Sequence, residues 1–170
     1  MTIVGWLLDV AAVVLVVTGA AKLVEPGYTT VALAAMGLPS SVTAVRAVAT
    51  GEAALGALAL TVRSAAPAAL VAASYAAFSV FVVVALRRGI PITSCGYLGR
   101  VEMPPTLSHV ALTAVVATGC VWAAVVAPEP LLDALGRRPG TAVAFAVAVG
   151  IGAFVVLRFL AARPVVRARR

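Results

Sequence analysis

The sequence predicts an all-α fold, a polytopic membrane helix bundle with a four-helix core and a fifth transmembrane helix at the C-terminal end. Hydrophobic residues make up 63% of the 170 residues and charged residues only 11%, whereas charged residues account for about 25% of a typical soluble chain. Apolar runs of about 18 residues or more, enough to cross about 30 Å of hydrocarbon, recur along the chain. Because lipid offers the backbone no hydrogen-bond partners, these runs are expected to be helical.

Five segments have the length and composition of membrane-spanning helices. They cover residues 3–23, 42–62, 65–86, 106–127 and 140–161. The connection after the first span opens with Pro26 and Gly27, so we expect it to leave the bilayer, with a short interfacial helix over 30–36. Only Arg63 and Ser64 separate the second span from the third, which predicts a helical hairpin.

The third connection, residues 87–106, is the natural place for a site. It reads "RRGIPITSCGYLGRVEMPPT", and its three prolines and three glycines exclude a continuous helix. Its last two prolines, Pro104 and Pro105, directly precede the fourth span, where proline favours a helix start. We expect residues 1–127 to form a four-helix unit and residues 128–170 to form the fifth helix and a basic tail.

The distribution of positive charge predicts the orientation in the membrane. Three of the basic residues fall on one side of a five-span chain, namely Arg63, Arg137 and Arg138. Ten fall on the other side: Lys22, Arg46, Arg87, Arg88, Arg100, Arg158, Arg163, Arg167, Arg169 and Arg170. The positive-inside rule then predicts a multi-pass protein of the cell membrane with its N-terminus outside and its C-terminus in the cytoplasm. Because these residues lie at helix ends and in the tail, the expected partner of the net charge of +7 is anionic lipid headgroups and not nucleic acid.

Glu52 lies near the middle of the second span, where an ionisable group costs roughly 2.5–3.5 kcal/mol on insertion scales. At 100° per residue it shares a stripe with Gly56, Ala59 and Arg63, and the small residues of this stripe allow close approach of a neighbouring helix. The favoured interpretation is a protonatable group facing a cavity, for proton transfer or for a hydrogen bond to a quinone-like headgroup. The alternative is a neutral or paired glutamate that fastens two helices.

The first span ends in "TGAAKLVEP", which places Lys22 and Glu25 on one helix face. Spacing favours a boundary lysine whose ammonium reaches the headgroups, over a lysine that points into the bundle and pairs with Glu25 or Glu52. Arg46 is likewise expected to extend to the headgroups. The depth of Asp9 is left open, because the span could begin after it.

His109 shares a stripe of the fourth span with Thr113, Val116 and Cys120. This stripe and Cys95 together offer one histidine and two cysteines, so we expect no metal site, which would need three or four ligands. His109 is expected to form a hydrogen bond to a neighbouring helix or to the 87–106 loop. Cys120 is expected to lie too deep in the bundle to pair with Cys95.

The lysine element "TGAAKLVEP", the intramembrane Glu52 and the "SCGYLGR" loop together resemble the methylamine-utilisation MauE and DoxX-like membrane proteins over about residues 10–127. The matching positions are Gly19, Lys22, Pro26, Glu52, Cys95, Gly96 and Gly99. The loop of the family resembles Cys-Gly-Cys-Phe-Gly. Here Tyr97 replaces the second cysteine and Leu98 replaces the aromatic residue.

The resemblance implies a four-helix bundle associated with redox chemistry, either disulfide formation in a partner or quinone-linked oxidation. Because thiol exchange needs a resolving thiol, Cys95 alone cannot complete a cycle. The favoured hypothesis is an accessory or anchoring subunit of a membrane redox complex, with a quinone as possible cofactor in a cavity near Lys22, Glu52 and His109. Two alternatives are a thiol or quinone oxidoreductase that uses Cys95, and a purely structural, lipid-contacting subunit. For the loop itself, a structural or partner-contacting turn is favoured over a reacting thiol.

Overall fold

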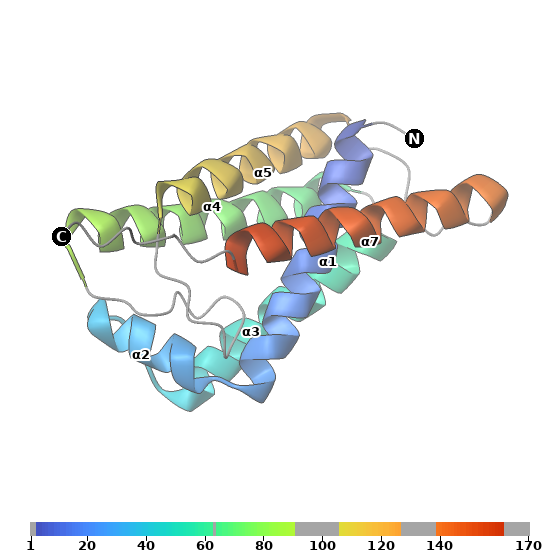
Figure 1. Ribbon diagram of the computed structural model, residues 1–170. Coiled ribbons are helices and arrows are strands. Elements are labelled where there is room, and N and C mark those ends of the chain that lie inside the picture. Colours follow the sequence, from blue (N-terminus) through green and yellow to red (C-terminus); the bar gives the residue numbers. More distant parts are fainter. Residues whose placement is uncertain (1–2, 63, 91–105, 127–138, 162–170) are drawn as a thin grey trace.

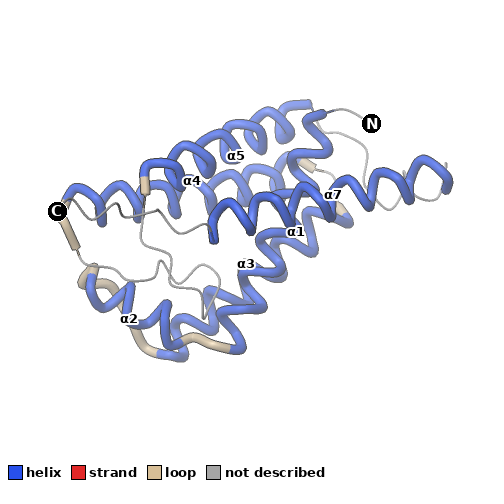
Figure 2. Tube along the Cα trace, in the orientation of Figure 1, coloured by secondary structure: helices blue, strands red, loops and turns tan. Residues whose placement is uncertain are grey.

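The computed structural model describes residues 3–62, 64–90, 106–126 and 139–161, and every regular element in these ranges is a helix (Figures 1 and 2). In chain order these helices are α1 (Ile3–Val24), α2 (Gly27–Ala35), α3 (Val42–Thr61), α4 (Ala65–Arg87), α5 (Leu107–Val126) and α7 (Pro139–Ala161). The ends of the five long helices differ from the predicted spans by at most one residue. The polytopic helical bundle predicted from composition is therefore confirmed.

Four of the helices, α1, α3, α4 and α5, are long and apolar enough to cross a membrane. The predicted fifth span coincides with α7, which contains an apolar stretch from Val143 to Arg158. Hydroxyl groups within the helices donate to backbone carbonyls one turn earlier, as Thr50 does to Arg46, Ser74 to Leu70 and Thr118 to Ala114. Such bonds satisfy a hydroxyl that lipid cannot solvate.

Helices α1 and α3 are antiparallel and pack backbone to backbone. A Cβ atom placed on Gly19 of α1 would lie 2.8 Å from the carbonyl oxygen of Ala49. A Cβ atom on Gly56 of α3 would lie 2.6 Å from the carbonyl oxygen of Ala12. Glycine is thus required at both contact points, and the close approach predicted for the stripe that holds Glu52 and Gly56 is confirmed.

Helices α4 and α5 form a second antiparallel pair, shown in green and tan in Figure 1. The buried Tyr75 of α4 donates a hydrogen bond of 2.9 Å from its hydroxyl to the carbonyl oxygen of Ala11 in α1. Buried side chains of α1, α3, α4 and α5 form one apolar core, which includes Leu8, Ala59, Val71 and Val116. The two pairs are therefore joined across α1.

Helix α7 also packs against α1, in a cluster that Leu112 of α5 joins. Val149 and Ala153 of α7 are buried against Val10 and Val14 of α1. Gly152 faces Trp6, and a Cβ atom there would lie 2.7 Å from the indole ring. Helix α7 thus contacts the first helix of the chain, while the assignment of residues 128–170 to a separate unit stays a prediction.

Helix α2 is the short helix predicted in the first connection, and it begins three residues earlier than expected. Its C-terminus is a Schellman motif: Gly37 has φ of 72°, and the backbone N–H of Leu38 donates to the carbonyl oxygen of Leu33 at 2.9 Å. Ala32 on its inner face is buried against Ala85 of α4. Helix α2 therefore covers the ends of α3 and α4 (Figure 1).

Replacing Gly56 by alanine is expected to destabilise the protein by about 1–3 kcal/mol, because the new methyl group would overlap the α1 backbone. The measurement is thermal unfolding of the purified protein in detergent. Gly51→Ala is the matched control, since Gly51 lies in the same helix and a Cβ atom there meets nothing within 4 Å. Equal unfolding temperatures for the two variants would contradict the close contact of α1 and α3.

Candidate functional site

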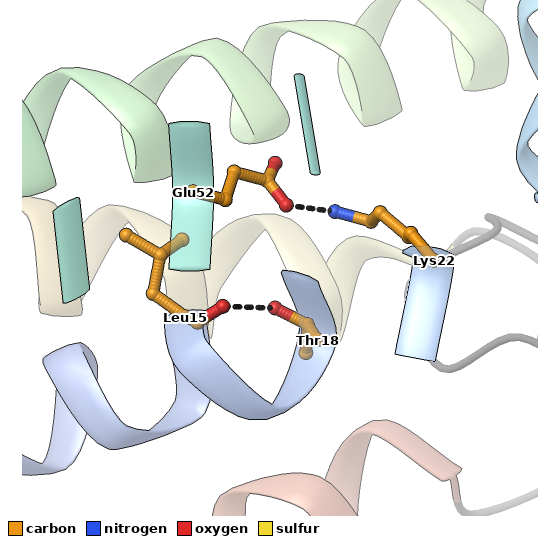
Figure 3. A network of polar contacts seen from close by, with 4 residues as sticks. All are labelled: Leu15, Thr18, Lys22 and Glu52. Carbon is orange, nitrogen blue, oxygen red and sulfur yellow. Dashed lines mark hydrogen bonds and ion pairs between the residues drawn. The ribbon is translucent and has the colours of Figure 1, made fainter. Parts of the chain in front are cut away.

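The structure brings Lys22 and Glu52 together as an ion pair between α1 and α3. The Lys22 ammonium Nζ donates to Glu52 Oε2 at 2.5 Å, and the two side chains are only 10% and 20% exposed. Figure 3 shows the lysine extending from the end of α1 toward the carboxylate. The sequence-based interpretation of Lys22 as a headgroup-contacting boundary lysine is therefore wrong.

The pair follows from the glycine contacts of the two helices. Lys22 lies three residues after Gly19, and Glu52 lies four residues before Gly56, so each charged residue shares a helix face with a glycine at the crossing. The nearby hydroxyl of Thr18 donates to the carbonyl oxygen of Leu15 within α1 at 3.2 Å (Figure 3). The close approach of the backbones thus places the two charges within hydrogen-bonding distance.

The other charged residues of these helices have different surroundings. Arg46 is exposed on α3, which agrees with the predicted extension to the headgroups. Glu25, one residue beyond α1, is half-buried. Asp9, whose depth the sequence left open, is buried six residues inside α1.

A cavity of about 170 Å³ lies beside the ion pair, between α1, α2, α3 and α4. Its polar lining residues are Lys22, Glu52 and Thr29. The remaining lining is apolar, with two aromatic residues and four aliphatic ones: Phe78, Phe81, Ala32, Leu33, Val45 and Val48. Glu52 is thus both a paired residue and a cavity residue, so each of the two interpretations of Glu52 describes part of its environment. Whether it transfers a proton stays a hypothesis.

His109 lies apart from this cavity lining, at the start of α5. It is buried, and its Nδ1 atom is 2.5 Å from the hydroxyl oxygen of Thr106, the last residue of the 87–106 loop. Because Thr106 lies only three residues before His109, this bond closes the first turn of α5, and a hydrogen bond to the Cys95 region or to a neighbouring helix stays a prediction. His109 is not among the residues that line this cavity, and a common site for His109, Lys22 and Glu52 stays a prediction.

The stripe of His109, Thr113, Val116 and Cys120 is buried along its whole length, as the helical spacing predicted. Thr113 shares a hydrogen bond of 2.6 Å with Ser79 of α4 and lies 2.7 Å from the carbonyl oxygen of His109. The polar face of α5 therefore joins α4 and α5. In the described part of the chain, no three His, Cys, Asp or Glu side chains gather as they would around a metal ion.

Sequence reasoning missed the α4 residues of the site. Phe78 and Phe81 line the cavity, and Tyr75 and Ser79 hold α4 against its neighbours. The sequence does contain signals for these residues. A tyrosine inside a membrane span needs a hydrogen-bond partner. Phe78 and Phe81 are three residues apart and therefore lie on one helix face. Their assignment to a particular neighbour needed the tertiary structure.

Cys95, Gly96, Tyr97 and Gly99 fall in residues 91–105, outside the described residues. Cys120, the second cysteine of the chain, carries a free thiol and is 0% exposed in the core formed with α1 and α4. The predicted depth of Cys120 in the bundle is thus observed, while its separation from Cys95 stays a prediction.

A comparison with models of known protein families shows which family this chain is related to. The family model described as methylamine utilisation protein MauE matches residues 1–127, three-quarters of the chain, and this range includes α1 to α5. The chain belongs to the MauE family. No curated protein and no solved structure was found to match it.

The MauE match covers the Lys22–Glu52 pair, the cavity and the Cys95 loop, and it ends before α7. The protein is therefore a MauE-family, multi-pass helical membrane protein whose apolar helices contact lipid. The further likeness to DoxX proteins and the comparison of "SCGYLGR" with a two-cysteine loop stay predictions. In this MauE protein, the paired charges can offer hydrogen bonds to a neutral molecule at the edge of the cavity.

The ion pair predicts a specific pattern of stabilities. Lys22→Met and Glu52→Gln are each expected to destabilise the protein, by about 3 kcal/mol, because each leaves one polar partner uncompensated between the helices. The double variant is expected to lose less than the sum of the two single variants. Unfolding in detergent measures all three, and Arg46→Met, which removes an exposed cation from α3, is expected to change stability by only about 0.5 kcal/mol. Strict additivity would exclude a coupled pair.

Proposed function

We propose that the protein is an accessory or anchoring subunit of a redox complex in the cell membrane. The observation that carries the proposal is the thiol content of the matched MauE bundle. The chain has two cysteines, and Cys120 is fully buried, so the chain presents at most one thiol, Cys95, to other proteins. Because thiol–disulfide exchange needs a second thiol to release the mixed disulfide, the chain alone cannot complete a redox cycle, and we assign the redox chemistry to a partner protein.

The description of the family supports an oxidative setting. Use of methylamine requires its oxidation, and a helix bundle with few charged groups suits the anchoring of an oxidising partner at the membrane. Several charged and hydroxyl groups form bonds within or between helices, such as Lys22 to Glu52 and Tyr75 to Ala11. Such bonds support a stable scaffold.

The proposed arrangement in the membrane has the N-terminus outside and the 87–106 loop in the cytoplasm. The distribution of basic residues supports this orientation, because ten of them would lie on the cytoplasmic side and three on the outer side. Arg87 and Arg88 at the end of α4 are exposed and would lie among anionic headgroups there. The partner is then expected to contact the bundle from the cytoplasmic face.

Thiol labelling tests this orientation. A membrane-impermeant maleimide is expected to leave the protein unlabelled in intact cells and to label it once the membrane is opened, because Cys95 would face the cytoplasm. Cys120 is fully buried and contributes little background. The Cys95→Ser variant provides the matched control and is expected to show no labelling in either preparation. Strong labelling of intact cells would reverse the orientation.

Isolation of the complex tests the proposed role. The tagged chain, purified from its native membrane in mild detergent, is expected to carry a protein with a redox cofactor or a reactive dithiol, identified by mass spectrometry and absorbance. Cys95→Ser is expected to leave both the assembly and the oxidising activity of this partner intact.

Two outcomes would replace the proposal. Loss of turnover in an assembled Cys95→Ser complex would make the protein a thiol oxidoreductase that uses Cys95. If the chain is isolated without a redox protein, and its removal affects only the integrity of the membrane, a structural, lipid-contacting role would replace the proposal.

A further inference from the structure

We propose that the cavity beside the Lys22–Glu52 pair binds the headgroup of a lipid-soluble, single-ring quinone. This inference deepens the proposed function and rests on it for the redox character of the ligand. The geometry of the cavity carries the remaining argument, through its size, its polar groups and its opening to lipid.

The size of the cavity fits one ring. Its volume is about 170 Å³, and an apolar cavity of about 150 Å³ in another protein holds a benzene molecule. One six-membered ring with small substituents therefore fills the space. A porphyrin or a folded isoprenoid tail would not fit inside.

The charges favour a neutral ligand that accepts hydrogen bonds. Lys22 and Glu52 neutralise each other, so an anion would compete with Glu52 for the ammonium, and a cation would compete with Lys22 for the carboxylate. A quinone carbonyl oxygen is a neutral acceptor, and the Lys22 ammonium at the cavity edge carries N–H donors. A reduced quinone carries hydroxyl groups, which the Glu52 carboxylate can accept.

The apolar walls suit the faces of such a ring. Phe78 and Phe81 come from one face of α4 and lie in the cavity lining with the ion pair. Aromatic side chains pack against a planar ring in stacked or edge-to-face contact. A mostly apolar pocket with a few polar groups is also the usual form of a small-molecule site.

Access to the cavity is from the side of the bundle. Val48 of α3 lines the cavity and is nevertheless 61% exposed, so it lies where the cavity meets the outer surface of a membrane-spanning helix. A ligand dissolved in the bilayer can enter there, and the tail of a quinone can stay in lipid while the ring is bound.

The test uses the purified full-length protein in detergent, titrated with decylubiquinone and followed by calorimetry and by the rise in unfolding temperature. Val48→Trp is expected to narrow the opening and to weaken binding about tenfold or more, equivalent to about 1.4 kcal/mol. Because Val48 is exposed, this variant is expected to fold as the wild type does. Val80→Trp is the matched control, since Val80 is 62% exposed on α4 and does not line the cavity.

A second ligand tests the role of the polar groups. Decylbenzene has the same tail and a ring without oxygen atoms, and it is expected to bind at least about tenfold more weakly than decylubiquinone. Equal binding of the two compounds would make the cavity a simple lipid pocket. Absence of decylubiquinone binding to the wild-type protein, or equal affinities of the Val48→Trp and Val80→Trp variants, would also overturn the proposal. These measurements need no partner, so their failure is distinct from failure to isolate a redox complex.

Discussion

The structure depends on the close contact of α1 and α3 at Gly19 and Gly56. Inside a membrane, lipid tails are as apolar as the side chains, so helices associate through tight packing and polar bonds and not through the hydrophobic effect. The missing side chains of the two glycines let the backbones touch. This contact brings the Lys22 ammonium to the Glu52 carboxylate, and each charge then has the partner that a membrane interior otherwise lacks.

The neutralised pair also determines the character of the space beside it. Helix α2 and the aromatic face of α4 enclose this space, so two charged residues lie at the edge of a mostly apolar cavity. Here the pair fastens α1 to α3 and also faces a cavity, and a stabilising contact and a binding function are compatible in the same two residues.

The second half of the bundle is held by a different set of polar bonds. The Tyr75 hydroxyl joins α4 to the backbone of α1, and Ser79 joins α4 to Thr113 of α5. His109 joins the start of α5 to Thr106, at the end of the loop that contains Cys95. This contact lies at the N-terminal end of α5, apart from the residues that line the cavity.

The sequence by itself determined the helical class, the ends of the five long helices to within one residue and the small-residue face around Glu52, because membrane thickness and backbone hydrogen bonding leave few alternatives. It also marked Glu52 and His109 as residues that need partners, and gave the pairing of Lys22 with Glu52 only as the less favoured alternative. Only the tertiary structure decided which partners these are. Spacing along one helix relates Lys22 to Glu25, whereas the pair with Glu52 joins residues 30 positions apart on two helices. The same reason applies to His109, Phe78 and Phe81: a helical period gives the face of a residue, and the crossing of the helices decides what that face meets.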